Sequence, residues 1–417
     1  MVIKSILLTG AVFLSLSSHA ATITISCGAA GQEIKECQDA GDAWGKRTGN
    51  TVKVVGAPPA ERLALYQQYL AAGSSDIDIF EIDVIWPGIL AQYLVDLTDK
   101  VDAATVAAHF PSIIANNTVH GKLLALPMYT DAGVLYYRKD LLDKYGFKPP
   151  STWADLEKQA LEIQDKERAA GHAQIQGYVW QGKSYEGLTV DALEWVASSQ
   201  GGTIVGNDGK ITIDNPAAAK ALDRAAGWVG KISPQGVLNY SEEESRGVFQ
   251  SGDAVFMRNW PYAWSLAQAA GSPIRDKVGV AALPAGDGGT SAAVLGGWQM
   301  SVSKFSKNPD AAIDFVKYLC GREQQKQHAI LYSQNPTIEA LYKDPDVLMA
   351  DPFLSSLFGV FTHAVARPSR IAGLRYAQLS AEFQSAVHDI LSAGGGAEKQ
   401  LPLLQSKLDR LSRGGHW

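Results

Sequence analysis

The sequence predicts an α/β protein with two lobes, each a mixed, mainly parallel sheet flanked by helices. Short apolar strands alternate with helical segments in the first part of the chain, which is the pattern of a parallel sheet. At 417 residues the chain is also too long for one small core. Hydrophobic residues make up 46% and charged residues 19%, as in an ordinary globular protein.

The first lobe is expected to contain residues 21–129 and 299–348. Alternating Thr and Ile predict a strand at 22–26, and apolar periodicities predict the elements that follow. These are a helix at 33–48, a strand at 52–55, a helix at 59–72, a strand at 77–83 and, after the chain returns, a helix at 308–320.

The second lobe is expected to contain residues 130–298 and 349–417, with hinge crossings near 126–133, 294–300 and 343–352. An Asn-Asp-Gly turn at 207–209 predicts a hairpin, and Pro261 is expected in the first turn of a helix at 259–270. Further strands are predicted at 134–137, 178–180 and 294–302, and helices at 152–170, 190–199, 216–231 and 241–250, with a helical pattern from 352 onward.

The N-terminus has the pattern of a cleaved secretory signal peptide at residues 1–20. Lys4 precedes an apolar run at 6–16, and Ser18 and Ala20 offer small residues at the cleavage positions. The alternative is a buried first helix or strand. No Cys follows Ala20, so we expect no lipid anchor, and no later stretch is apolar enough to span a membrane. We therefore expect a periplasmic protein that is not membrane-embedded.

Charge and cysteine content exclude some classes of function. A net charge of −6 disfavours nucleic-acid binding. The three cysteines and scattered histidines form no metal-site spacing, and we expect no metal and no cofactor. An oxidising compartment permits a Cys27–Cys37 disulfide. The alternative is that the two thiols are held apart, because Cys27 ends a strand and Cys37 lies about one turn into a helix, so the pairing stays open.

Several charged residues are expected near the ends of strands in the first lobe. Asp83 ends the third strand, where open α/β sheets bind ligands, although it could instead cap the helix entered near Trp86. Glu33 opens a helix, where it would also complement the helix dipole. Glu61 and Arg62 open the next helix on the same side, and capping is the favoured role of Glu61.

Aromatic residues lie in the second lobe and in the crossing near 294–300. Trp260 and Trp264 are four apart and would share a helical face, so we assign Trp260 to a ligand and Trp264 to the core. Gly297 permits close approach to a ligand, and Trp298 could stack on it. Flat aromatic faces suit the C–H faces of a sugar ring.

Three polar residues complete the candidate site. Tyr129 and Asp131 lie in the first crossing, where the alternative is a hinge without ligand contact. Arg367 could fork to two neighbouring hydroxyls, and its alternative is a surface ion pair.

Five segments carry a family resemblance: 78–86, 126–153, 179–188, Arg258-Asn-Trp-Pro-Tyr-Ala-Trp264 and Leu295-Gly-Gly-Trp298. Over nearly the whole mature chain, the sequence resembles the family 1 extracellular solute-binding proteins of sugar ABC importers, in their trehalose/maltose-binding branch. It departs from them at Met257, where relatives often carry an acid, and in two extra arginines, Arg370 and Arg375.

The resemblance implies a class II-like periplasmic binding protein fold with the ligand between the lobes. It implies a monomer that binds an α-linked glucose disaccharide, trehalose or maltose, and delivers it to inner-membrane permease subunits. The matching ligand-contact positions are Glu33, Asp83, Tyr129, Asp131, Trp260, Gly297, Trp298 and Arg367, to which we add Arg62.

Two other functions compete with this reading. A secreted glycosidase could use Asp83 and Asp131 as paired carboxyls, but no nucleophile elbow, metal motif or phosphate loop appears, and we expect no enzyme. A receptor of the same fold could bind another solute, such as an amino acid, iron or a polyamine. Iron sites of this fold use paired Tyr and His, and polyamine sites are strongly acidic, so a tryptophan-rich site favours a neutral polyol.

Overall fold

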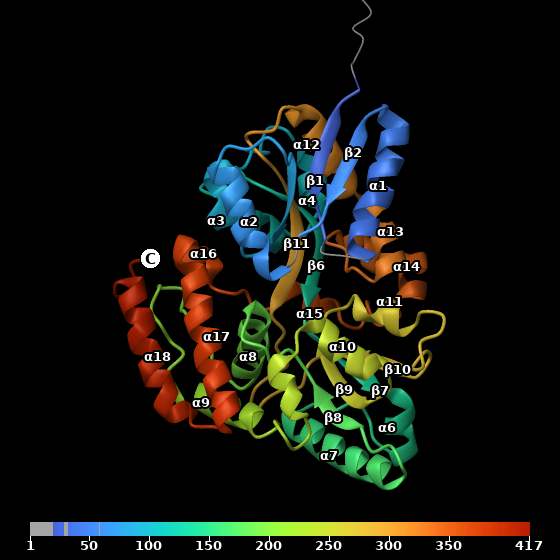
Figure 1. Ribbon diagram of the computed structural model, residues 1–417, viewed down its shortest axis with the longest axis vertical. Coiled ribbons are helices and arrows are strands. Elements are labelled where there is room, and N and C mark those ends of the chain that lie inside the picture. Colours follow the sequence, from blue (N-terminus) through green and yellow to red (C-terminus); the bar gives the residue numbers. More distant parts are fainter. Residues whose placement is uncertain (1–19, 29–31, 58) are drawn as a thin grey trace, which may run out of the picture.

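The computed structural model describes residues 20–28, 32–57 and 59–417, and its two bodies are each built on a separate sheet (Figure 1). The predicted signal peptide lies outside the described residues, except for Ala20. Within the described part of the chain, no helix combines the length and apolarity needed to cross a bilayer.

The first body contains a five-stranded sheet in the order β2-β1-β3-β11-β6. Strands β1, β2 and β3 are parallel, whereas β11 runs antiparallel to both β3 and β6. Ile23 and Ile25 of β1 are fully buried, as the alternating Thr and Ile pattern predicts. The strands are β1 Thr22–Ser26, β2 Thr51–Val55, β3 Ile79–Asp83, β6 Leu126–Ala132 and β11 Leu295–Val302.

Helices cover this sheet on both sides (Figure 1). On α1, Cys37, Ala40 and Trp44 recur every three to four residues and are buried in the same core as β1, so this face packs on the sheet. The helices are α1 Gln32–Thr48, α2 Pro59–Ala71, α3 Pro87–Leu90, α4 Ala103–Ala108, α5 Pro111–Asn117, α12 Pro309–Leu319, α13 Arg322–Tyr332 and α14 Pro345–Ala350; β4 Thr118–Val119 and β5 Lys122–Leu123 form a small ribbon.

The second body contains a four-stranded sheet in the order β10-β7-β9-β8. Only the β8–β9 pair is parallel. Its strands are β7 Val134–Arg138, β8 Gln176–Val179, β9 Ala254–Asn259 and β10 Val278–Ala281. Its helices are α6 Lys139–Tyr145, α7 Trp153–Ala169, α8 Glu186–Ser198, α9 Pro216–Ala226, α10 Glu242–Gln250 and α11 Ala263–Ala267.

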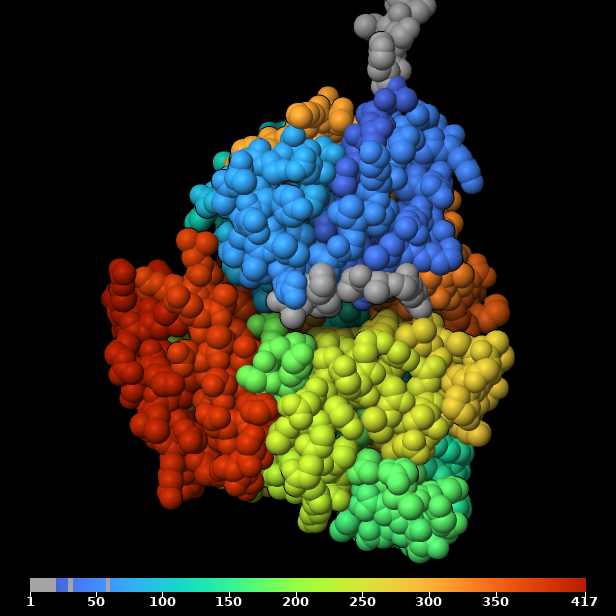
Figure 2. Space-filling model, in the orientation of Figure 1, coloured from blue at the N-terminus to red at the C-terminus, as the bar shows by residue number. Residues whose placement is uncertain are grey.

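The C-terminal helices lie against the flank of the second body, drawn in red in Figures 1 and 2. Leu379, Phe383 and Val387 of α17 are buried in the core that also contains α8 and α9. The segments are α15 Phe358–Thr362, α16 Ser369–Ala372, α17 Tyr376–Ala393 and α18 Ala397–Ser412, and α17 ends at Gly394 in the left-handed conformation.

The sheets are mixed and mainly parallel in strand direction, as expected: β11 in the first sheet and β7 in the second run against the other strands of their sheets. One feature of the second body corrects the sequence predictions. The predicted helix at 259–270 is wrong in its first part. Residues Ala254–Asn259 form a central strand that pairs on both sides, and the helix begins only at Ala263. Pro261 and Trp260 thus lie in the turn before it, so Trp260 and Trp264 share no helical face.

Two strands connect the bodies. Strand β6 of the first sheet is followed after Gly133 by β7 of the second, and β11 leads back into the first sheet. Cys27 and Cys37, left open by the sequence, form a disulfide between the end of β1 and α1. The connecting strands place residues from both bodies next to each other.

Candidate functional site

The residue pairing of β11 brings together three of the predicted site residues. Trp298 lies opposite Asp83 of β3 on one side and opposite Tyr129 of β6 on the other. The ladder shifts register between Trp298 and Gln299. An irregularity of this kind redirects a side chain, and it occurs where the strand passes between the bodies.

The indole of Trp298 rests on a charged side chain. The guanidinium carbon of Arg62 lies 4.4 Å from the centroid of this ring, and Trp86 packs edge-on against it with centroids 5.6 Å apart. An arginine on an aromatic face is a favourable cation–π contact that also fixes the ring. Arg62 therefore supports the indole of Trp298 from one face of the ring.

Arg62 is itself held by the first body. Its side chain is only 2% exposed, and Nη1 donates to Oε2 of Glu81 at 2.9 Å, while Nε and Nη2 donate to the carbonyl of Ala57. Burial raises the pKa of Glu81 to about 7, against the opposing effects of Arg62 and the Gly28 amide. Glu33 lies at the edge of this group, 4.0 Å from Nη2 of Arg62, with its side chain 55% exposed.

Arg367 joins the two bodies. Its Nη2 donates to Oδ1 of Asp83 at 3.1 Å, and its Nη1 donates to Oε1 of Glu186, on the first turn of α8, at 2.9 Å. The side chain is 3% exposed, so the alternative of a surface ion pair is wrong. Asp83 also accepts from the amide of Ile85, two residues on, but does not cap α3, whose N-cap is Trp86.

Two glycines let the strands approach the remaining site residues. At Gly297, φ is 113°, and an added Cβ would lie 2.5 Å from the carbonyl oxygen of Tyr129. At Gly296, an added Cβ would lie 2.9 Å from Cζ3 of Trp260 and 3.2 Å from the Cβ of Asp131. Trp260 and Asp131 thus both lie close to the position that a side chain on Gly296 would occupy, and they leave no room for one.

The carboxyl of Asp131 and the phenol of Tyr129 are both perturbed. Burial raises the pKa of Asp131 to about 7, Arg258 opposes that rise, and Asp83 adds to it. Burial likewise raises the pKa of Tyr129 well above its ordinary value. A carboxyl that holds its proton near neutral pH, close to a phenol, offers both hydrogen-bond donors and acceptors. This combination suits the hydroxyl groups of a ligand.

A buried ion-pair cluster lies beneath Trp260. The guanidinium carbon of Arg258 is 4.1 Å from the ring centroid of Trp260, and Nε and Nη2 donate to the two carboxylate oxygens of Glu194 at 2.8 and 2.7 Å. Oε1 of Glu194 also accepts from the amide of Val294. The Arg258–Glu194 pair therefore supports both the ring of Trp260 and the chain that leads into β11.

Sequence reasoning missed these supporting acids, Glu81, Glu186 and Glu194. Their arginine partners lie 19, 181 and 64 residues away in the chain, respectively. The available signal was a hydrophobic stretch interrupted by a charge, because an acid in an apolar helix or strand needs a buried partner. Such a signal identifies the acid but not which arginine it pairs with.

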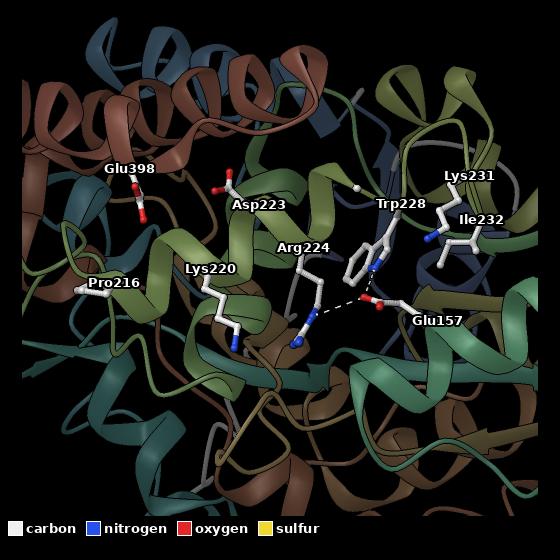
Figure 3. A pocket seen from close by; sticks show the side chains of 10 residues that line it. Glu157, Pro216, Lys220, Asp223, Arg224, Trp228, Lys231, Ile232 and Glu398 are labelled. Carbon is white, nitrogen blue, oxygen red and sulfur yellow. Dashed lines mark hydrogen bonds and ion pairs between the residues drawn. The ribbon is translucent and has the colours of Figure 1, made fainter.

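A separate cavity of about 650 Å³ lies in the second body between α7, α9 and α18 (Figure 3). In its lining, Glu157 accepts from the indole of Trp228 and pairs with Arg224, which also pairs with Asp287 outside the lining. It contains none of the predicted site residues. The candidate site is therefore the group at the junction of the bodies.

Comparison with known proteins identifies the family. The family model for bacterial extracellular solute-binding proteins matches residues 30–326. A relative from Deinococcus radiodurans described as a probable ABC transporter-binding protein is 52% identical over 413 residues, 98% of each chain. A mannitol-binding protein from Pseudomonas aeruginosa is 26% identical over 218 residues, 50% of this chain and 47% of its own.

Solved structures agree with this result. The maltose-bound MalE3 of T. maritima superposes with a TM-score of 0.89 at 41% identity, covering 94% of this chain and 100% of its own. The bipartite fold, the two connecting strands and the family match lead to one conclusion. The chain belongs to the bacterial extracellular solute-binding proteins.

Proposed function

We propose that this protein is the periplasmic substrate-binding protein of an ABC sugar importer and binds an α-linked glucose disaccharide, trehalose or maltose. The sugar would lie between the two bodies, with Glu33, Arg62 and Asp83 on one side and Trp260 and Arg367 on the other. Tyr129, Asp131, Gly297 and Trp298, on the crossing strands, complete the proposed set.

One observation carries the proposal. Two tryptophans, each supported by a buried arginine 4.1–4.4 Å from its ring centroid, occur within one group of fixed carboxyls and a third arginine. Rigid aromatic faces pack on the C–H faces of pyranose rings, and fixed planar charges bind pairs of neighbouring hydroxyls. The 41% identity with a maltose-bound protein supports an α-glucoside over other solutes.

Binding would favour closure of the bodies. A sugar that contacts residues of both bodies binds best when they are together, so it shifts the population toward the closed form. We propose that this closed monomer docks on the permease. The group provides binding only, and the sugar is expected to leave the site chemically unchanged.

Calorimetric titration tests the proposal. Mature protein would be unfolded, stripped of retained sugar, refolded and titrated with trehalose, maltose, sucrose, glucose and mannitol, the last because one relative is named for it. We expect one-to-one binding of trehalose or maltose, and recovery of the intact disaccharide by chromatography. Binding of mannitol alone, or release of glucose, would overturn the assignment.

A further inference from the structure

We propose that Glu186 is a positioning residue that sets the place and orientation of the Arg367 guanidinium, and thereby the affinity for ligand. Its carboxylate receives three donors. Oε1 accepts from Nη1 of Arg367 at 2.9 Å and from the hydroxyl of Tyr376 at 2.5 Å, and Oε2 accepts from the hydroxyl of Ser380 at 2.6 Å. This inference rests on the proposed function.

The three donors come from two parts of the fold. Tyr376 and Ser380 lie on successive turns of α17, whereas Arg367 lies between α15 and α16. Glu186 itself opens α8. Ser380 is held in turn by a hydrogen bond to Thr189. A carboxylate fixed from two helices has one orientation, so its remaining contact fixes Arg367 as well.

The opposite edge of the guanidinium faces the first body. Nη2 donates to Oδ1 of Asp83 at 3.1 Å and to the carbonyl of Leu295 at 3.3 Å. Nε of Arg367 is buried and lacks an acceptor among residues 20–28, 32–57 and 59–417. Because Nη1 is committed to Glu186 and Nη2 to Asp83 and Leu295, the donor left for a ligand oxygen is Nε. Nη2 lies on the same edge of the planar group and becomes available to a ligand where its contact with Asp83 is released.

Glu186 also keeps Arg367 with the second body. A buried guanidinium needs a counter-charge, and Glu186 and Asp83 supply it from different bodies. When the bodies separate, the contact with Asp83 is lost and the contact with Glu186 remains. Arg367 therefore stays preorganised for the next ligand, which lowers the cost of ordering it on binding.

Titration of five variants tests this role. Glu186→Ala removes the anchor, and Glu186→Gln keeps the acceptor oxygen but removes the charge. Arg367→Met removes the group that is positioned, and Glu382→Ala, which loses only an exposed ion pair with Lys407, is the matched control. The double variant Glu186→Ala/Arg367→Met closes the cycle.

We expect Glu186→Ala to weaken sugar binding on the order of tenfold or more, Glu186→Gln to weaken it less, and Glu382→Ala to have no effect. In the Arg367→Met background, Glu186→Ala should add less than about twofold, because Glu186 acts through Arg367. Unchanged binding in Glu186→Ala, or an equal loss in both backgrounds, would overturn the inference. If Glu186→Ala fails to fold, the same cycle is read with Glu186→Gln.

A readout without sugar separates this inference from the proposed function. In crystal structures of the sugar-free proteins, we expect the guanidinium of Arg367 in Glu186→Ala or Glu186→Gln to leave the position beside residue 186 and α17 that it keeps in the wild type. An unmoved guanidinium would overturn the positioning role even if the wild type bound no sugar. Absence of binding by the wild type would instead overturn the proposed function alone.

Discussion

The guanidinium of Arg258 lies 4.1 Å from the ring centroid of Trp260 and is bound along one edge by Glu194. The same Glu194 accepts from the amide of Val294, which precedes β11. An added Cβ on Gly133, at the other crossing, would lie 2.2 Å from Oε1 of Glu194. One buried ion pair thus supports an aromatic face and both connecting strands.

Arg258→Met should be strongly destabilising. It leaves Glu194 and Asp191 buried without their counter-charge, which costs roughly 3–5 kcal/mol of unfolding free energy. Urea denaturation measures the change. Lys407→Met, which breaks an exposed pair with Glu382, is the control and should cost less than about 1 kcal/mol. Equal stability of the two variants would contradict the supporting role of Arg258.

Trp298→Ala should weaken sugar binding while leaving the protein folded. It removes the face that Arg62 supports, and a buried aromatic anchor contributes about 2 kcal/mol, or roughly thirtyfold in affinity. Trp298→Phe should retain most of the affinity because it keeps a flat face. Trp417→Ala, at the C-terminus and bound to Gly209, is the control for tryptophan loss. Calorimetry that gives wild-type affinity for Trp298→Ala would rule out stacking.

Gly297→Ala should lower stability because of backbone and space together. Its φ of 113° is strained for any L side chain, and the new Cβ would meet the Tyr129 carbonyl at 2.5 Å. Such strain costs of order 1–3 kcal/mol. Gly359→Ala is the matched control, since it lies in helix α15 with nothing within 4 Å of the added Cβ. It should be neutral or stabilising by up to about 1 kcal/mol in thermal denaturation. Similar melting temperatures for the two variants would show that the crossing can relax.

The first body was predictable from sequence because its elements alternate locally. Ile23, Ile25 and the periodic face of α1 report their burial through neighbours a few residues away. The strand at Ala254–Asn259 was not predictable in this way. Its place between β7 and β8 depends on partners far along the chain, and the sequence Asn-Trp-Pro that ends it resembles a helix start.

The same distinction applies to the candidate site: some of its residues can be recognised from the local strand pattern, and others depend on contacts between distant residues. Asp83, Tyr129 and Trp298 end or cross strands, and positions of that kind can be recognised from the strand pattern. The contacts that hold the arginines in place are not part of that local pattern. Whether Arg367 is a surface residue or a buried bridge depends on Glu186 and Asp83, which meet only after both bodies have folded.

The pH dependence of stability should carry a contribution from Asp131. Burial raises the pKa of this carboxyl to about 7 from an ordinary value of 3.8. Between these values the folded protein holds a proton that the unfolded chain has released, so the contribution is full below about pH 4 and is lost as pH rises to about 7. Asp131→Asn removes it. The stability of this variant relative to wild type should therefore rise between pH 4 and 7 and level off above. Glu81 and Asp351, whose pKa values burial also raises to about 7, remain in both proteins and cancel in the difference.

Asp208→Asn is the control. The amide of Lys210 lowers the pKa of that exposed carboxyl, so its contribution changes only below about pH 4, and the stability difference between this variant and wild type should be flat between pH 4 and 7. Parallel curves for Asp131→Asn and wild type, measured by urea denaturation at each pH, would show that the Asp131 carboxyl titrates normally and is not neutral at the centre of the site.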